Sequence, residues 1–482
     1  MTRRWKMLIA GAALSGTAAC TVGPRDLNAH ADLPPATAAR PETIAPAAGP
    51  AQAVVDTTAP SEWWHAFNST RLDTLVSAAL AHNNDLTVAE ATLRQAREQA
   101  FATGASAFPQ ADASYQAERV RVSDALSPNI ANQNQQLYTL HTAQVTVNYD
   151  ADLFGGVRQR IRSARAAAEV QRHRLDAART SVVGNLVQAV ITRASLAAQI
   201  EAARTSIAVN RDILSRIQLQ QRLGAVGLAD VATQQTALAT AESALPPLER
   251  AEAHQQVLIA TLIGVAAGNP LPALPTLDDL ALPARLPLTL PSDLVARRPD
   301  VRAAQAQLVG AGADVGAAIA ARLPSITLSA NAGGVAQRFG DMFRSGNPFW
   351  ALLGGITQPI FHAGQLKHQQ RAAEAALDGA KAQYRGTVLQ AFADVSDALT
   401  ALRTDAEQLD AATRSTQAAG QALTFVRRQL ALGSVGTLAL LNATAADAQA
   451  RQQVIQARAG RLSDTVALFT ASGGVIAAPP AN

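Results

Sequence analysis

Alternation between apolar and polar residues marks two segments in each half of the chain. In "ADASYQAE" (111–118) and "QVTVNYD" (144–150), every second residue is apolar and the residues between are polar. The segments "SITLSANA" (325–332) and "FWALLGGITQ" (349–358) repeat this arrangement in the second half. Because successive side chains of a strand point to opposite faces, we predict four strands, each with one apolar and one polar face.

Very long segments without proline follow each pair of predicted strands, at 157–223 and 365–432. As helices, each would run about 100 Å at the helical rise of 1.5 Å per residue. Within the first, Ile200, Ile207 and Leu214 recur every seven residues, which predicts a coiled-coil-like seam.

Two shorter helices complete the first half. One is predicted at 84–107 and ends before Pro109, because the residue before a proline avoids the helical conformation. The other is predicted at 228–264, is broken at Pro246-Pro247, and returns antiparallel to the long helix. The reversal falls at "LGAVG" (223–227), where glycine adopts positive φ at little cost.

The two halves are copies of one unit. The turn "LGAVG" at 223 returns as "LGSVG" at 432, 209 positions later (432 − 223). Likewise, Asp85 and Asp300 stand 215 positions apart (300 − 85) in matching helical segments. A period this long predicts a duplicated domain rather than a solenoid. We therefore divide the chain into repeat 1 at 61–265, a proline-rich connector at 266–292, repeat 2 at 293–472 and a C-terminal tail at 473–482.

The N-terminus has the form of an export signal. Three basic residues precede an apolar run that ends in small residues, which predicts a signal peptide at 1–19. The only cysteine, Cys20, follows at once and predicts a lipoprotein cleavage site, with a lipid-anchored tether at 20–60. The alternative is an ordinary signal peptide cut near Ala19, which leaves a free cysteine. Acyl chains on Cys20 are the only non-protein group that we expect.

Composition narrows the class of protein. Aromatic residues make up 4% and charged residues 16% of the chain, and alanine is abundant, which favours helices packed through small side chains. Removal of residues 1–19 takes three basic charges and lowers the net charge from +4 to +1, so a nucleic-acid partner is not indicated. One cysteine and eight scattered histidines, with no catalytic motif, predict neither an enzyme nor a metal site.

The strands limit what the chain can build. Segments of about ten alternating residues are long enough to cross a bilayer when tilted. Open strand edges are too costly in lipid, and four strands are fewer than the smallest barrels contain. The chain must then oligomerise, to 8 strands as a dimer or 12 as a trimer. The alternative is a soluble hairpin in a periplasmic scaffold or adaptor without a pore.

The chain resembles the trimeric outer-membrane efflux channels of the TolC and OprM kind, in their lipid-anchored branch. The matching segments include "CTVGP" (20–24), "ALAHNNDL" (79–86), "ARRPDVRAAQAQL" (296–308), "AARLPSITLSA" (320–330) and "PIFHAGQL" (359–366). The resemblance implies a mainly α fold with a small β part: a trimer with a 12-strand outer-membrane barrel that continues into a 12-helix periplasmic barrel. It further implies docking onto a periplasmic adaptor and an RND-type inner-membrane pump, in the efflux of drugs or other small toxic compounds. A protein-secretion exit duct of the same fold is an alternative.

The resemblance also assigns roles to the two glycine turns and to the residues that follow them. Gly224 and Gly433 correspond to the helix-hairpin tips where the adaptor docks, and the predicted docking surface adds Ala225, Val226, Ser434 and Val435. At the pore entrance, Ala439 and Asn442 stand where the family often has two carboxylates, whereas Asp230 keeps its charge.

We predict a pore constriction at Asp230, Leu438, Ala439 and Asn442. We expect apolar packing of Leu438, Leu440 and Leu441 to set this constriction more than charge does. The alternative for Asp230 is a solvated carboxylate favoured by the dipole at a helix start.

Overall fold

The computed structural model describes residues 22–24, 43–44, 51–121, 137–288, 297–474 and 476. The predicted signal peptide and the predicted acylation of Cys20 lie outside the described residues, as does most of the tether. Within them, the predicted strands and long helices are present at the expected positions, and both long helices have 67 residues.

The same order of elements occurs twice: helix, two strands, very long helix, tight turn and returning helix. In the first copy these elements are α3 (Asn84–Ala105), β3 (Gln110–Arg121), β4 (Leu137–Ala151), α4 (Gly156–Arg222), α5 (Leu228–Ser243) and α6 (Leu245–Leu262). In the second they are α8 (Pro299–Ala320), β6 (Ser325–Ala336), β7 (Pro348–Thr357), α9 (Gln365–Ala431) and α10 (Thr437–Ala471). The remaining elements are β1 (Thr43–Ile44), β2 (Gln52–Val55), η1 (Trp63–Phe67), α2 (Thr70–His82), η2 (Leu277–Asp279), β5 (Arg285–Pro287) and η3 (Phe339–Asp341).

The chain divides into two compact units, and both long helices contribute to each. One unit comprises Met1–Asp32, Leu93–Val170 and Ala304–Tyr384, and we term it the sheet unit. The other comprises Leu33–Thr92, Gln171–Ala303 and Arg385–Asn482, and we term it the hairpin unit.

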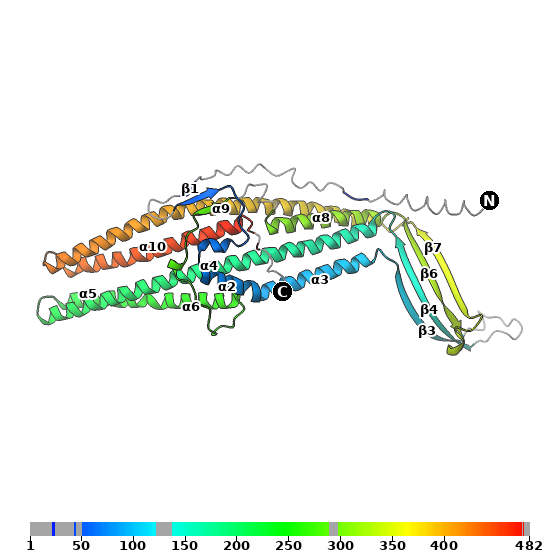
Figure 1. The fold of residues 1–482 in the computed structure, drawn as a ribbon, viewed down its shortest axis with the longest axis horizontal. Helices are drawn as coiled ribbons and strands as arrows, with labels where there is room; N and C mark the ends of the chain where they lie inside the picture. The colour runs from blue at the N-terminus through cyan, green and yellow to red at the C-terminus, as the bar shows by residue number, and fades with distance from the viewer. Residues whose placement is uncertain are drawn as a thin grey trace. The chain divides into compact units, whose positions relative to one another are not determined.

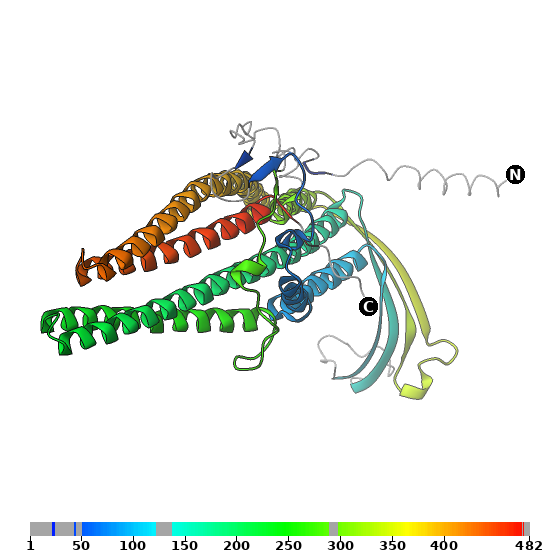
Figure 2. The same ribbon diagram turned by 60° about the vertical axis from the view of Figure 1, so that its left-hand side comes forward.

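The sheet unit contains a four-stranded antiparallel sheet in the order β3-β4-β6-β7 (Figure 2). β4 from the first copy pairs with β6 from the second over eleven residue pairs, from His141 with Ala336 to Ala151 with Ile326. The edge strands β3 and β7 each pair on one side only among the described residues. Their outer backbone groups are therefore available to further strands.

The hairpin unit holds the main apolar core. Trp63 is fully buried, and its ring stacks on that of Phe469 in α10 with centroids 5.5 Å apart. The middle of α4 packs against this cluster through Val183, Leu186 and Ile191. A small sheet of β1, β2 and β5 belongs to the same unit. Each large aromatic ring buried in such a core removes about 150–250 Å² of surface from water.

Figure 1 shows two long hairpins in this unit: α4 with α5 and α6, and α9 with α10. The predicted seam on α4 is confirmed at Ile200 and Ile207, which are buried, but not at Leu214, which is only half-buried. Ile213 is buried instead. The buried residues Ile207, Asn210, Ile213 and Ile217 follow one another at steps of three, three and four residues, so the buried stripe departs from a strict seven-residue repeat.

The helices within each hairpin are held together by different kinds of contact. In the first, ion pairs cross from α4 to the returning helices: Arg193 with Glu252, Arg204 with Glu249, and Arg211 with Glu242, at 2.8–3.1 Å. In the second, small residues allow close approach, and the hydroxyl of Thr416 in α9 donates to the carbonyl of Ala450 in α10 at 3.0 Å.

Candidate functional site: a two-faced sheet, two helix joints and two hairpin tips

Strand register places apolar residues from all four strands on one face of the sheet. Ala113 stands opposite Val145, Val145 opposite Ala332, and Ala332 opposite Trp350. Residues directly opposite one another share a face. Trp350 is 80% exposed, so this face is apolar and uncovered in the single chain. Neighbouring rows add the pairs Ala111 with Val147, Ala330 with Leu352, and Ile326 with Ile356.

Polar residues of β3, β4 and β6 line the opposite face, whereas β7 places Phe349, Ala351 and Leu353 there. Asp112 stands opposite Thr146, and Thr146 opposite Asn331. Ser114 stands opposite Gln144 in the next polar row. A sheet with one apolar face, one polar face and two open edges suits closure around water within a membrane.

Aromatic side chains gather beside the end of β6 and its turn to β7, next to the middle of β3. The Tyr115 hydroxyl and His141 Nδ1 share a hydrogen bond of 2.7 Å, and the two rings stack. Phe339, in the turn between β6 and β7, meets Tyr115 edge to face with centroids 5.6 Å apart. At the other end, where strands give way to helices, Ile360 and Phe361 are 93% and 85% exposed. Two such girdles flank the apolar band of membrane barrels.

We term the place where α3 begins beside the end of α6 the first joint. The Asn83 side-chain amide donates to the carbonyl of Leu262 at 2.9 Å, and its oxygen accepts from the backbone N–H groups of Asp85 and Leu86. Gly264 has a φ of +74°, and a Cβ there would collide with the carbonyl oxygen of His82. The first joint therefore requires glycine at this position.

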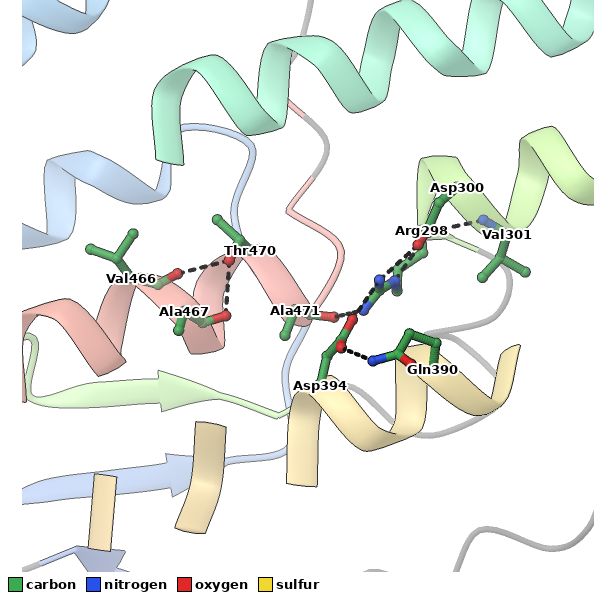
Figure 3. A network of polar contacts seen from close by, with 9 residues as sticks. All are labelled: Arg298, Asp300, Val301, Gln390, Asp394, Val466, Ala467, Thr470 and Ala471. Carbon is green, nitrogen blue, oxygen red and sulfur yellow. Dashed lines mark hydrogen bonds and ion pairs between the residues drawn. The ribbon is translucent and has the colours of Figure 1, made fainter. Parts of the chain in front are cut away.

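The equivalent second joint lies where α8 begins beside the end of α10 (Figure 3). Arg298, 215 positions after Asn83 (298 − 83), donates to Asp300 at 2.7 Å and to Asp394 of α9 at 2.8 Å. It also donates to the carbonyl of Ala471 at 3.3 Å. Burial lowers the pKa of Arg298, but its bonds to Asp300 and Asp394 outweigh burial and leave the pKa raised, so the guanidinium stays charged. The second joint thus joins three helices.

A cavity of about 700 Å³ adjoins the second joint and has acidic walls. Asp397 and Asp464 line it from α9 and α10, and Asn185 and Gln188 line it from α4. Burial raises the pKa of Asp464 to about 7, and a hydrogen bond with Asp405 and the charge of Asp405 add to the rise. Asp464 therefore holds a proton below neutral pH, beside Asp405.

The hairpin tips have the same backbone design. The Gly224 N–H donates to the carbonyl of Gln221 and the Ala225 N–H to that of Gln220, which is a Schellman motif. Gly433 and Ser434 repeat these bonds to Leu430 and Gln429 at the second tip. The φ angles of Gly224 and Gly433 are +77° and +72°.

Sequence reasoning missed the most exposed apolar residues of the tips. Leu223 and Leu432 are 75% and 78% exposed, and Leu228 and Leu438 are exposed too. Val226, in contrast, packs partly against a buried cluster that contains Ile217. The missed signal was the leucine that opens each copy of the repeated turn.

Asp230 lies in the first turn of α5, and its carboxylate accepts two hydrogen bonds. One carboxylate oxygen accepts from the Gly227 N–H at 3.1 Å, and the other accepts from the Thr437 hydroxyl at 3.3 Å. The first bond is that of a carboxylate at a helix N-terminus, where the dipole favours negative charge. The second connects the start of α5 to the start of α10, so Asp230 joins the two hairpins.

The burial of Leu440 contradicts the prediction that this residue helps to set the pore constriction. It is 7% exposed and packs in the hairpin core with Ile213, Ile217 and Leu423, so it is not available to a pore. Leu438 and Asn442 are exposed, and Ala439 and Leu441 are half-buried. Residues two apart on a helix lie about 200° apart, which puts Leu438 and Leu440 on opposite sides.

These features define the class: a subunit of an outer-membrane channel, with a four-stranded sheet that has one apolar face and with long helical hairpins. The model of the outer membrane efflux protein family matches residues 75–265 and again residues 290–474. The chain belongs to this family.

Relatives of known function and solved structures support the same family assignment. The chain is 31% identical over 438 residues to the pyoverdine export outer membrane protein OpmQ of Pseudomonas putida, covering 89% of this chain and 90% of that protein. It is 29% identical over 430 residues to the toluene efflux pump outer membrane protein TtgC of Pseudomonas putida, covering 89% and 88%.

Among solved structures, the outer-membrane channel OprN superposes with a TM-score of 0.85 at 26% identity, over 94% of this chain and 99% of that one. The open state of the MtrE outer membrane channel of Neisseria gonorrhoeae gives 0.81 at 25% identity, over 96% and 100%. The protein is thus an outer-membrane efflux channel subunit that serves as an exit duct.

Proposed function

We propose that three copies close their sheets into one 12-strand barrel and their hairpins into a 12-helix periplasmic tube. The unpaired edges carry this proposal. β3 and β7 are 12 and 10 residues long, and each is paired on one side only among the described residues. An unsatisfied backbone group in hydrocarbon costs several kcal/mol, so the edges must meet edges of other copies.

The face assignment follows from this closure. The face with Trp350 and Leu352 contacts lipid, and the face with Asp112, Thr146 and Asn331 lines the water-filled bore. Transport through such a bore needs no catalytic chemistry, and we infer that the chain performs none.

A matched pair of variants tests the faces. Leu352 and Ala351 are adjacent in β7 and point to opposite faces. We expect Leu352→Arg to abolish the heat-modifiable trimer in outer-membrane extracts, because arginine on the lipid face near the midplane costs about 2–4 kcal/mol per copy. Ala351→Arg should insert normally and change single-channel conductance. Equal effects of the two variants would contradict the barrel.

We also propose that the tips dock onto a periplasmic adaptor, through which an RND-type inner-membrane pump drives export. The exposed Leu223 and Leu432, together with Ala225 and Ser434, provide an apolar and small-residue surface suited to helix tips of a partner. Leu223→Asp with Leu432→Asp should abolish adaptor cross-linking and efflux while trimer yield is unchanged. Val257→Asp, an exposed apolar site on α6, is the control. Normal cross-linking in the double variant would contradict this assignment.

For the pore entrance, we propose that Asp230, Leu438, Ala439 and Asn442 surround the constriction. Because Asp230 already accepts two hydrogen bonds, the entrance carries fewer free acceptors than a ring of solvated carboxylates would. Weak block of single channels by multivalent cations is expected. Strong block that is lost in Asn442→Ala would contradict this prediction.

The cargo that we propose is a small molecule. The relatives are named for the export of pyoverdine and of toluene. The bore itself is polar and unspecific, so the inner-membrane pump selects the compound. A deletion strain screened for sensitivity to antibiotics, solvents and iron limitation would identify it.

A further inference from the structure

A short N-terminal segment, Val22-Gly23-Pro24, lies in a slot of the sheet unit. Gln159, in the first turn of α4, donates from its side-chain amide to the carbonyl of Val22 at 3.1 Å. Gly316 of α8 forms the other wall. A residue from each copy of the duplicated unit therefore holds this segment.

The fit leaves no room for a side chain on either glycine. A Cβ on Gly23 would lie 3.0 Å from the Cα of Gly316, and Gly23 has a φ of +138°. Conversely, a Cβ on Gly316 would lie 2.8 Å from the carbonyl oxygen of Val22 and 2.8 Å from Cδ of Gln159. Such contacts are closer than van der Waals distance, so the slot excludes any other residue at 316 while the segment is in place.

Gln159 supports a docking role rather than a packing role. It is 7% exposed, and its Oε1 has no hydrogen-bond partner among the described residues. A buried amide is costly unless its groups are paired, and the pairing that this one has is with the N-terminal segment. Replacement by an apolar residue would be the simpler solution for packing alone.

The slot lies where the sheet ends and the helices begin. The Val22 N–H points to the carbonyl of Phe154 at 3.5 Å, and Phe154 lies between the end of β4 at Ala151 and the start of α4 at Gly156. Val22 follows Cys20 by two residues, and two residues span at most about 7 Å. A group attached to Cys20 must therefore leave the protein close to this end of the sheet.

We propose that the slot between Gln159 and Gly316 is a docking site for the chain's own N-terminal segment, and that docking sets where the lipid anchor on Cys20 enters the membrane. The segment also bridges α4 and α8, so its docking stabilises the junction of the two repeats. The statement about lipid rests on the proposed barrel, whereas the statement about docking does not.

A double-mutant cycle on the full-length trimer in detergent tests the docking. Gly316→Ala should lower the temperature of trimer dissociation by about 5 °C or more, because its methyl group expels the segment. In a background where Val22, Gly23 and Pro24 are all changed to serine, the same change should cost about 1 °C or less, since the Gln159 amide is then free to move. Gly310→Ala is the control on the same helix, where a Cβ would meet Ala166 at an ordinary 3.4 Å.

If Gly316→Ala lowered the dissociation temperature equally in both backgrounds, the proposed docking site would be wrong. The loss would then come from helix packing alone. A photo-crosslinking residue in place of Thr21 gives a second measurement that does not depend on stability. It should label peptides from 150–165 or 310–322 in the parent and in Gly310→Ala, but not in Gly316→Ala. Unchanged labelling in Gly316→Ala would also overturn the proposal. Neither measurement uses efflux, so failure of the channel assignment alone would leave both results intact.

Discussion

The two joints have equivalent positions in the duplicated chain but different chemistry. At the first, a neutral amide, Asn83, reaches the last turn of α6. At the second, a charged guanidinium, Arg298, reaches the last turn of α10 and also Asp394 of α9. Both joints place a glycine with φ near +75° just after the terminal helix, Gly264 at +74° and Gly473 at +75°.

The comparison separates what duplication preserves from what it allows to change. The backbone reversal is preserved, because only glycine adopts that φ without strain. The side chain that fills the joint has diverged, because a longer cation can reach a third helix that an amide cannot. Asparagine connects two helix ends, the last turn of α6 and the first turn of α3, whereas arginine stabilises a three-helix contact that includes the long helix α9.

The largest difference between the joints is expected at the glycines. Gly264→Ala should destabilise the protein by roughly 3–4 kcal/mol, because the added Cβ collides with the carbonyl oxygen of His82 in addition to the strain of positive φ. Gly473→Ala should cost only about 1–2 kcal/mol, since the nearest atom, Cγ of Arg298, is 3.3 Å away and belongs to a flexible side chain. Dissociation temperatures of the purified trimers measure both. Equal losses would show that strain alone governs the joints.

A smaller effect is expected from the polar groups. Arg298→Ala should cost about 2–3 kcal/mol, because it leaves Asp394 beside Asp300 without their shared cation. Asn83→Ala should cost about 1–2 kcal/mol, through loss of neutral hydrogen bonds. The two losses should differ in salt dependence, and only that of Arg298→Ala should shrink at 1 M salt. Parallel salt curves would contradict the assignment of charge to the second joint alone.

The smallest effect concerns pH and the acidic cavity beside the second joint. The pKa of Asp464 is raised to about 7 in the folded protein from its ordinary value of 3.8. Between these values the native state holds a proton that the unfolded state has lost, so stability falls as pH rises through this window. Asp464→Asn should therefore raise the dissociation temperature at pH 8 by a few degrees and leave it unchanged at pH 4.

Two further variants complete that experiment. Asp405→Asn removes the smaller contributions to the raised pKa of Asp464 and should weaken the pH dependence, while burial of Asp464 keeps part of it. Asp410→Asn is the control, because Asp410 pairs with Arg414 on its own helix at 3.2 Å. A pH dependence that is as steep in Asp464→Asn as in the parent would show that the proton on Asp464 is not its source.

Local patterns alone determined much of this protein. The alternation at 144–150 predicts a two-faced strand, and the proline-free segments at 157–223 and 365–432 form the two 67-residue helices. Gly224 and Gly433 could be assigned as turn residues because the conformation of a tight turn depends on the residues within it. The duplication is likewise visible in one dimension, since matching segments keep their order and spacing.

Only the tertiary structure decided which side of each helix is covered and which distant residues meet. Leu438 and Leu440 are similar in sequence, yet one is exposed and the other buried, because the packing of α10 on its neighbours selects the face. The bond from Arg298 to Asp394 joins residues 96 positions apart, and that from Thr437 to Asp230 joins residues 207 apart. Such pairs depend on how helices pack in three dimensions, and the periodicity of a single segment carries no information about its partner.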